Sequence, residues 1–543
     1  MFGLMQDRPL LVSSLIEYAD QIHGETEIVS RCADGMHRGT WRSTHKRARQ
    51  LASALIALGV KPGDRVATLA WNSHRHLELY YAVSGIGAVL HTVNPRLFPE
   101  QLTYIINHAE DTLLFYDTAF APLVEKLKPE LPTVKHFVVL ADEAATAAVQ
   151  KSHPYVRSYE ALLSGQRDDY VWPVLDENTA AALCYTSGTT GNPKGVLYSH
   201  RSTVLHALAS CMKDVLGLSC QESVLLIVPM FHASGWGVPY SAAMAGAKVV
   251  FPGAALDGAS VCELLNSESC TLSLGVPTVW LGLLAYLDKH PESKPKHLRR
   301  MLIGGSAAAR ALIARLESEL SVDVIHLWGM TEMSPVGTAS QRPRHWNTLS
   351  SDEKLDLKVK QGRVMWGVEL KIVDDNGQAL PHDGKAFGTV KVRGPWIAKS
   401  YFRSEGGSIV DDDGWFSTGD VATIDPSGYM QITDRAKDVI KSGGEWISSI
   451  DLENAALVHP AVQEAAVIGV AHPTWQERPL MLVICKPGQS VTRDELQSVL
   501  ASKVAKWWLP DDILFVSELP HTATGKLNKL KLREQYQHHK LPT

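Results

Sequence analysis

The stretch with the clearest chemical purpose is 185–196, Tyr-Thr-Ser-Gly-Thr-Thr-Gly-Asn-Pro-Lys-Gly-Val. Its hydroxyl side chains can donate hydrogen bonds to anionic oxygens, its glycines let backbone N–H groups approach them, and its lysine adds a point charge. An apolar run at 180–184 predicts a strand before it, and helical spacing of apolar residues predicts a helix over 199–216 after it. A phosphate-binding loop is therefore predicted, made by Thr186, Ser187, Gly188, Thr189, Thr190 and Lys194.

Two other interpretations of this loop were weighed. A Walker A motif requires G-x-x-x-x-G-K-[ST]. It is excluded because Pro193 stands where its second glycine should be and Gly195 where its magnesium-binding hydroxyl should be. A flexible surface turn is the simpler alternative, but turns rarely combine four hydroxyls, three glycines and a lysine between a strand and a helix.

Three further stretches carry side chains suited to a nucleotide. In 326–332, an aromatic ring beside a glycine can stack on a purine, while Thr331 and Glu332 can reach phosphate and a hard cation. Asp420, expected on a tight turn, suits two hydrogen bonds to ribose hydroxyls. Lys526 follows a glycine and is placed to reach into a site. Their simpler alternatives are a buried Trp with a helix-capping Thr, a solvated Asp and a surface lysine.

Alternating helix and strand signals must position these residues. Residues 43–116 predict helices and strands in turn, and the alternation resumes from 224 to 327. This pattern predicts an α/β fold with parallel strands, in which ligands gather beyond the carboxyl ends of the strands. The loop at 185, Gly304-Gly305 and Trp328-Gly329 all follow predicted strands, so we expect them to converge on one site.

The pattern changes towards the C-terminus. Short strands separated by turns over 362–433 predict a small β subdomain, and the segment from 437 onwards has an α+β pattern. At 543 residues the chain is too long for one core. We therefore predict a large N-terminal domain of α/β subdomains plus the β subdomain, 1–436, and a small mobile α+β domain, 437–543.

Composition and charge restrict the function. The formal net charge of −5 shows no basic excess, so nucleic acid is not an expected partner. The seven cysteines include no CxxC pair, which argues against a disulfide framework or a zinc site. Neither a signal peptide nor a transmembrane segment is predicted, which favours a cytoplasmic enzyme. The sequence leaves the oligomeric state open, a homodimer included.

Taken together, these stretches resemble the signature motifs of the adenylate-forming superfamily, which comprises acyl-CoA ligases, peptide-synthetase adenylation domains and luciferases. The matches run from residue 185 to residue 526 and so cover nearly the whole chain. The resemblance implies ATP and AMP binding, with Mg²⁺ held by Thr186 and Glu332. The implied nucleotide-binding residues beyond the loop are Gly304, Gly305, His326, Trp328, Gly329, Met330, Thr331, Asp420, Arg435 and Lys526.

The same resemblance implies catalytic, acyl-binding and CoA-binding residues. Lys526 and His232 are the implied catalytic residues, and Lys437 matches the position of the hinge between the domains. The implied acyl pocket consists of His232, Trp236, Gly305, Gly329 and Pro335. The implied CoA-binding residues are Lys437, Lys441, Gly443, Gly444, Glu445 and Trp446. The chain departs from many members in having Trp328 in place of Tyr and Trp446 in place of Asn.

The predicted function is that of an ATP-dependent carboxylate–CoA ligase, which forms an acyl adenylate and then transfers the acyl group to coenzyme A. Through 326–332 and 442–448 the chain is most similar to bacterial medium-chain fatty acyl-CoA ligases, and 3-(methylthio)propionate–CoA ligases look much the same. A medium-chain fatty acid is the expected substrate and the thioether acid the alternative. A carrier-protein-loading enzyme and a luciferase would share the motifs. A non-enzymatic nucleotide-binding protein would be expected to have lost Lys526 or Glu332.

Overall fold

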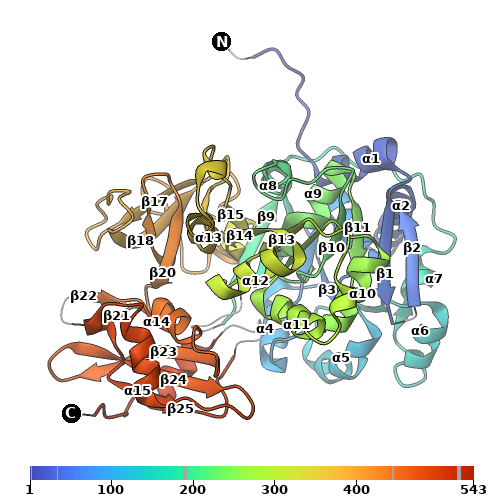
Figure 1. Ribbon diagram of the computed structural model, residues 1–543. Coiled ribbons are helices and arrows are strands. Elements are labelled where there is room, and N and C mark those ends of the chain that lie inside the picture. Colours follow the sequence, from blue (N-terminus) through green and yellow to red (C-terminus); the bar gives the residue numbers. More distant parts are fainter. Residues whose placement is uncertain (2, 34, 187–191, 443–444, 522–526, 543) are drawn as a thin grey trace.

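The computed structural model describes residues 1, 3–33, 35–186, 192–442, 445–521 and 527–542, with side chains left undescribed at 445 and 446. A large N-terminal domain is followed by a smaller C-terminal domain, which lies at the lower left in Figure 1. The fold class predicted from the sequence, α/β with a β subdomain and a small α+β domain, is confirmed.

A nine-stranded sheet lies in the N-terminal domain, in the order β16-β15-β14-β13-β12-β10-β11-β1-β2. The strands from β14 to β1 pair in parallel, and antiparallel strands close both edges. The bounds are β1 Glu27–Cys32, β2 Gly35–Thr40, β10 Ser223–Leu226, β11 Lys248–Phe251, β12 Leu272–Gly275, β13 Arg300–Ile303, β14 Asp323–Gly329, β15 Val336–Ala339 and β16 Arg363–Val364.

A seven-stranded sheet forms the other half of this domain, in the order β7-β6-β5-β3-β4-β8-β9. Only β9 runs antiparallel to its neighbour among the pairs described for this sheet. The bounds are β3 Arg65–Leu69, β4 Val89–Thr92, β5 Leu113–Tyr116, β6 His136–Val139, β7 Arg157–Ser158, β8 Ala180–Tyr185 and β9 Gly195–Ser199.

Helices lie between the two sheets and on their outer faces. Side chains alternate between faces along a strand: in β10, Val224 and Leu226 join the core shared by both sheets, whereas Leu225 faces the outer helices. The shared core contains α1 Val12–His23, α2 Trp41–Ala57, α3 His74–Gly85, α7 Tyr159–Leu163, α8 His200–Cys211 and α9 Val238–Ala245. The outer helices are α4 Pro99–Ala109, α5 Ala121–Leu127, α6 Glu143–Gln150, α10 Gly258–Ser267, α11 Pro277–Leu287, α12 Arg310–Leu320 and α13 Ser351–Val359.

Two smaller sheets complete the chain. The β subdomain is a four-stranded antiparallel sheet of β17 Glu369–Val373, β18 Phe387–Arg393, β19 Phe416–Ile424 and β20 Met430–Arg435. The C-terminal domain has a five-stranded sheet of β21 Ile440–Ser442, β22 Glu445–Ile447, β23 Val462–His472, β24 Gln476–Cys485 and β25 Asp512–Phe515. Its helices are α14 Ser449–Ala456, α15 Arg493–Ala501 and α16 Lys529–Tyr536.

The helix predicted over 199–216 is present but shorter, and the strand before it was not predicted. A strand, β9, follows the loop at 185 before any helix, because Gly195 to Ser199 pair with β8 and turn the segment into a hairpin. The helix that follows, α8, ends at Cys211. Leu208 and Met212, which the periodicity placed on the buried face, are about half exposed.

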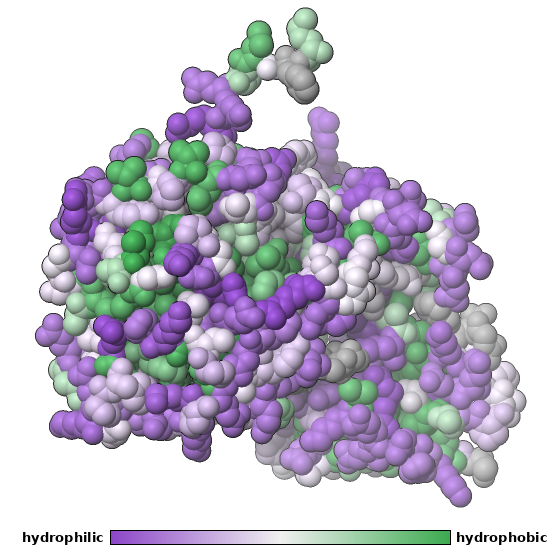
Figure 2. Space-filling model, turned by 180° about the vertical axis from the view of Figure 1, so that it is seen from behind, coloured by the Kyte–Doolittle hydropathy of each residue, from purple (hydrophilic) through white to green (hydrophobic). Residues whose placement is uncertain are grey.

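Hydrophilic and hydrophobic side chains are interspersed on the face shown in Figure 2. Across the part of the chain that the structure describes, no helix combines the length and the apolar character that crossing a bilayer requires.

Candidate functional site

The loop at 185 is closed at its base by two hydrogen bonds. The N–H of Thr186 donates to the Lys194 carbonyl at 2.9 Å, and the N–H of Lys194 donates to Thr186 Oγ1 at 3.2 Å. Both residues sit at the mouth of the β8–β9 hairpin. Four predicted loop residues, Ser187, Gly188, Thr189 and Thr190, lie outside the described residues, so their roles stay predictions.

A tyrosine connects this loop to the predicted cation ligand. Tyr401 donates its hydroxyl to Glu332 Oε1 at 2.7 Å, and the ammonium of Lys194 lies 4.8 Å from the centre of the Tyr401 ring. Burial and the adjacent Glu332 carboxylate raise the pKa of Tyr401, so the hydroxyl stays a donor at neutral pH. Lys194 and Glu332, from different sheets, are therefore brought to one place.

The residues present fit a magnesium ion that arrives with a nucleotide. Among the described residues, no group of three or more His, Cys, Asp and Glu side chains is arranged to hold a metal alone. Mg²⁺ is commonly bound by one or two carboxylates together with substrate phosphates and water. Glu332 would supply one carboxylate ligand, and the hydroxyl of Thr186 would supply a second oxygen ligand.

Asp420 lies inside strand β19, so its predicted placement on a tight turn is wrong. The carboxylate is buried because β18 and β20 pair on both sides of β19. Trp328 donates its indole N–H to Asp420 Oδ2 at 3.0 Å, and Arg435 Nε lies 2.8 Å from Oδ1. Trp328, Asp420 and Arg435 thus form one connected group, joined by a hydrogen bond and an ion pair.

His326 lies in β14, two residues before Trp328. Burial lowers its pKa to about 4, so the ring is neutral at physiological pH, and Nδ1 lies 3.0 Å from the Val359 carbonyl. Its backbone N–H donates to Ser340 Oγ at 2.7 Å. The ring is packed among backbone groups, which suits a positioning role for the strand end at Trp328.

The segment 329–335 folds back on itself. Met330 donates its N–H to the Pro335 carbonyl at 3.0 Å, and Tyr198 donates its hydroxyl to the Thr331 carbonyl at 2.7 Å. A side chain at Gly329 would collide with the Pro335 carbonyl, so only glycine fits there. The fold therefore brings Gly329 and Pro335, both predicted to border the acyl pocket, into contact.

A left-handed turn follows His232 and contains Trp236. His232 precedes the turn, and residues 233–237 all have positive φ, from 39° at Ala233 to 75° at Gly237. The Trp236 ring packs on the Gly304-Gly305 backbone, where a Cβ on Gly304 would lie 2.7 Å from Cη2 of the indole. The turn thus places the Trp236 ring against the two glycines that follow β13.

The predicted hinge lies beside a cluster of buried charges. Lys437 is exposed, and partial desolvation lowers its pKa. Just before it, Asp434 Oδ2 accepts the N–H of Ser449 at 2.6 Å. Lys529, from α16, pairs with Glu453 of α14 at 2.7 Å. These contacts join β20 to the start of the C-terminal domain.

The predicted CoA-binding segment forms the β21–β22 hairpin. Lys441 pairs with residue 446 across it, and its N–H donates to Glu477 Oε2 at 2.9 Å. Gly443, Gly444 and Lys526 lie outside the described residues, as do the side chains of Glu445 and Trp446. Their predicted roles remain predictions.

Two protein-family models match the chain. Residues 17–402 match the model of the AMP-binding enzyme family, and residues 451–526 match the AMP-binding enzyme C-terminal domain. The chain belongs to the AMP-binding enzyme family. The resemblance seen in the sequence is thereby confirmed.

Relatives of this AMP-binding enzyme share nearly its whole length. It is 52% identical to the medium-chain-fatty-acid–CoA ligase of Ectopseudomonas oleovorans, over 99% of this chain and 98% of that one. It is 51% identical to the 3-methylmercaptopropionyl-CoA ligase of Ruegeria lacuscaerulensis, over 99% of both chains. Among solved structures, the anthranilate CoA ligase AuaEII in complex with anthranoyl-AMP is similar, with a TM-score of 0.85, 27% identity and 98% of this chain covered.

Sequence reasoning missed two parts of the AMP-binding enzyme's site. Tyr401 lies in an irregular segment with no motif, and only its contacts with Lys194 and Glu332 reveal it. Lys529 follows Lys526 by three residues and belongs to none of the motifs recognised in the sequence. Its burial beside Glu453 could be seen only once α16 was placed.

We predict that the Trp328–Asp420 hydrogen bond supports nucleotide binding. Trp328→Phe keeps an aromatic face but removes the indole N–H that Asp420 accepts. A hydrogen bond to a charged group contributes about 1.5–3 kcal/mol, so KM for ATP should rise roughly tenfold or more. Steady-state kinetics at varied ATP concentration measures this KM.

Trp396→Phe is the matched control for this variant. Trp396 is also buried, and among the described residues its Nε1 has no hydrogen-bond partner. It should lose ring volume without changing KM for ATP. An equal rise in both variants would assign the effect to packing instead of the hydrogen bond.

Proposed function

We propose that the protein is an ATP-dependent carboxylate–CoA ligase that converts a medium-chain fatty acid into its acyl adenylate and then into its CoA thioester. The observation that carries the proposal is the 52% identity over 99% of the chain to a medium-chain-fatty-acid–CoA ligase. The geometry agrees, because Lys194 and Glu332 meet through Tyr401 while Asp420 is held by Trp328 and Arg435.

A 3-(methylthio)propionate–CoA ligase is the second candidate. The 51% identity to a 3-methylmercaptopropionyl-CoA ligase is one percentage point below the first relative, which does not separate the two acids. A carrier-protein-loading enzyme is less favoured, because both of these relatives are named CoA ligases.

The first half-reaction needs charge neutralisation and alignment more than proton transfer. A carboxylate is ionised at pH 7 and needs no general base to attack the α-phosphorus of ATP. The Lys194 ammonium faces the phosphates from the loop, and Lys526 reaches them from the C-terminal domain. Asp420 and Arg435 hold the ribose. Mg²⁺, when bound at Glu332 and Thr186, neutralises further phosphate charge.

The second half-reaction requires a different face of the C-terminal domain. A rotation about Lys437 withdraws Lys526 and brings the 441–446 hairpin to the acyl adenylate, so that the CoA thiol can reach it. Ser448 and Ser449 donate hydrogen bonds to Thr433 and Asp434 of β20, so this rotation would have to break both contacts. His232, beside the left-handed turn, borders the acyl group.

A panel of carboxylic acids tests the proposed function directly. Purified protein is incubated with ATP, Mg²⁺, CoA and straight-chain acids of increasing length, together with 3-(methylthio)propionate, and AMP release is measured. We expect release that depends on the acid and on CoA, with a maximum at medium chain length. Absence of AMP release with every acid would contradict the proposal.

Lys526 is expected to act in the first half-reaction alone. Lys526→Ala removes a charge-assisted contact made mainly in the transition state, which should slow adenylation by about 10²–10³-fold, or roughly 3–4 kcal/mol. ATP affinity should change little, and thioester formation from a pre-made acyl adenylate should survive. The control is Lys531→Ala, an exposed lysine on the same helix as Lys529. Equal loss of both half-reactions would rule out separate roles for the domain.

Lys437 is expected to act as the hinge. Lys437→Pro fixes φ at this position and should hinder the rotation. Adenylation should continue while CoA transfer stops, so that acyl-AMP accumulates relative to acyl-CoA in a quenched time course. Lys437→Ala, which leaves φ free, is the control. Normal acyl-CoA output from the proline variant would remove Lys437 as the hinge.

Trp236 is expected to limit the length of the acyl chain. Trp236→Ala removes an indole that fills about the volume of several methylenes, and each methylene of substrate buried there contributes roughly 0.8 kcal/mol. The preference should move to longer acids, with kcat/KM rising by more than roughly tenfold per two carbons gained.

A purely structural role for Trp236 makes a different prediction. The side chain is 7% exposed, and truncating such a residue costs roughly 3–5 kcal/mol of stability. Trp172→Ala, at 9% exposure, is the matched control. A lower melting temperature in both variants, with an unshifted chain-length series, would leave Trp236 as a core residue only.

A further inference from the structure

A buried asparagine joins the two large sheets of the N-terminal domain just before the left-handed turn. Asn72 lies between β3 and α3, at the end of a strand of the seven-stranded sheet, and is 3% exposed. Its amide nitrogen donates to the carbonyls of Leu226 and Val228, at 2.8 Å each. Its amide oxygen accepts the N–H of Met230 at 2.7 Å. One side chain thus holds three positions at the end of β10, a strand of the nine-stranded sheet.

The pattern of these hydrogen bonds fixes the course of residues 226–230. The bonded groups belong to alternate residues, as do the groups along one edge of an extended strand. Both donors and the oxygen of the Asn72 amide are engaged, so a shift of the segment by one residue would break all three bonds. Tyr80, from α3, adds a fourth bond by donating its hydroxyl to the Met230 carbonyl.

Met230 connects this segment to the left-handed turn. His232 donates its N–H to the Pro229 carbonyl at 3.0 Å, and Gly235 donates its N–H to the His232 carbonyl at 3.0 Å. The turn then folds back on Met230, since a Cβ added at Gly235 would lie 3.4 Å from Met230 Cα. A displacement of Met230 would therefore move both His232 and the turn that contains Trp236.

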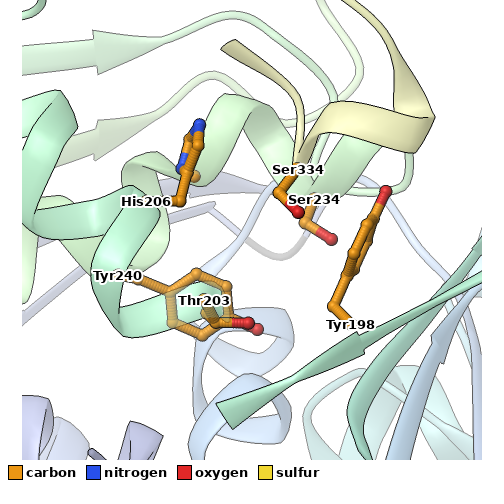
Figure 3. Close-up of a pocket in the computed structure, with 7 residues that line it drawn as sticks. Tyr198, Thr203, His206, Ser234, Tyr240 and Ser334 are labelled. Atoms are coloured by element: carbon orange, nitrogen blue, oxygen red, sulfur yellow. The ribbon is translucent and has the colours of Figure 1, made fainter. Parts of the chain in front are cut away.

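Two other tyrosines near the turn do not hold it in this way. Figure 3 shows Ser234 of the turn in the wall of a small cavity, together with Tyr198 of β9 and Tyr240 of α9. Tyr198 donates its hydroxyl to a carbonyl of the segment after β14. Among the residues that the structure describes, neither the Ser234 nor the Tyr240 hydroxyl has a hydrogen-bond partner. Within that part of the chain, these two tyrosines therefore donate no hydrogen bond to the turn, whereas Tyr80 holds the segment before it.

We propose that Asn72 is a positioning residue for the acyl site: by holding residues 226–230, it sets where His232 and Trp236 stand against the bound acid. This inference rests on the proposed carboxylate–CoA ligase function, in which these two side chains border the acyl group. The hydrogen bonds described for the Asn72 side chain all go to 226–230 and to no residue proposed to bind the nucleotide. Loss of its amide should therefore weaken binding of the acid and leave ATP binding unchanged.

Asn72→Asp tests the proposal, because it keeps the size of the side chain and replaces the donor by an acceptor. An ionised carboxylate can accept the Met230 N–H but has no hydrogen to donate to the carbonyls of Leu226 and Val228. We expect KM for the acid to rise at least roughly tenfold while KM for ATP stays within about twofold, because small displacements at a reacting site can cost about a hundredfold. Both constants are measured from AMP release with CoA present.

Hydrogen exchange gives a second measurement that does not depend on activity. Backbone amides of residues 226–238 should exchange at least roughly fivefold faster in Asn72→Asp than in the wild-type protein, because local opening of the segment becomes easier. Tyr80→Phe removes one hydrogen bond to the same segment and keeps the ring. It should change KM for the acid and the exchange rate in the same direction by a smaller factor, and it decides the question if Asn72→Asp does not fold.

Two variants outside this segment are matched controls. Asn266, in α10, also donates its amide to two backbone carbonyls, at 3.2 and 2.8 Å. Tyr429 is also buried and also donates its hydroxyl to a backbone carbonyl. Asn266→Asp and Tyr429→Phe should lower the melting temperature without changing KM for the acid or the exchange of residues 226–238.

The remaining outcomes separate this inference from the proposed function. If KM for the acid and KM for ATP rise equally in Asn72→Asp, or if neither changes while the melting temperature falls, Asn72 serves stability alone and the inference is overturned. Unchanged exchange at 226–238 overturns it as well. Faster exchange with an unchanged KM for the acid overturns it while leaving the ligase function intact. Failure of the wild-type protein to release AMP with any acid would instead contradict the ligase function.

Discussion

Between His232 and Val238 the backbone passes through five consecutive residues with positive φ, and Ala233, Ser234 and Trp236 among them are not glycines. Left-handed geometry costs an L-residue roughly 1–2 kcal/mol, so such a turn persists only where its surroundings hold it. Here Ser241 donates to the Gly237 carbonyl at 3.1 Å at one end. In the middle, the Trp236 ring packs on Gly304. The positions of His232 and Trp236, which are proposed to border the acyl group, follow from this constraint.

The residues proposed to bind the nucleotide come instead from segments that belong to separate sheets. Thr186 and Lys194 come from the seven-stranded sheet, Glu332 follows β14 of the nine-stranded sheet, and Asp420 comes from the β subdomain. Tyr401 connects two of these parts through its contacts with Lys194 and Glu332. Trp328, at the end of β14, connects two of them through its hydrogen bond to Asp420. The site therefore depends on the packing of the large domain and cannot form in any one sheet alone.

The motifs and the alternating elements could be predicted because they are local. The alternation predicted over 43–116 is present as α2 to α4 with β3 to β5, and that over 224–327 is present as α9 to α12 with β10 to β14. Strand β9 was missed because its pairing with β8 is a tertiary feature, and the buried position of Asp420 depends on strands on both sides. Tyr401 and Lys529 carry no local signal, since only distant partners give them a role.

The last helix reaches beyond the family match and back to the junction of the domains. The match to the C-terminal domain ends at residue 526, whereas α16 supplies Lys529 to Glu453 and Arg533 to Asp438 in the linker. A chain shortened at the boundary of the match would lose both cations that pair with these carboxylates. Glu453, whose pKa burial raises to about 7, would lose its nearest positive charge. The residues after the match thus help to stabilise the junction of the domains. A chain ended at the boundary of the family match would lack them.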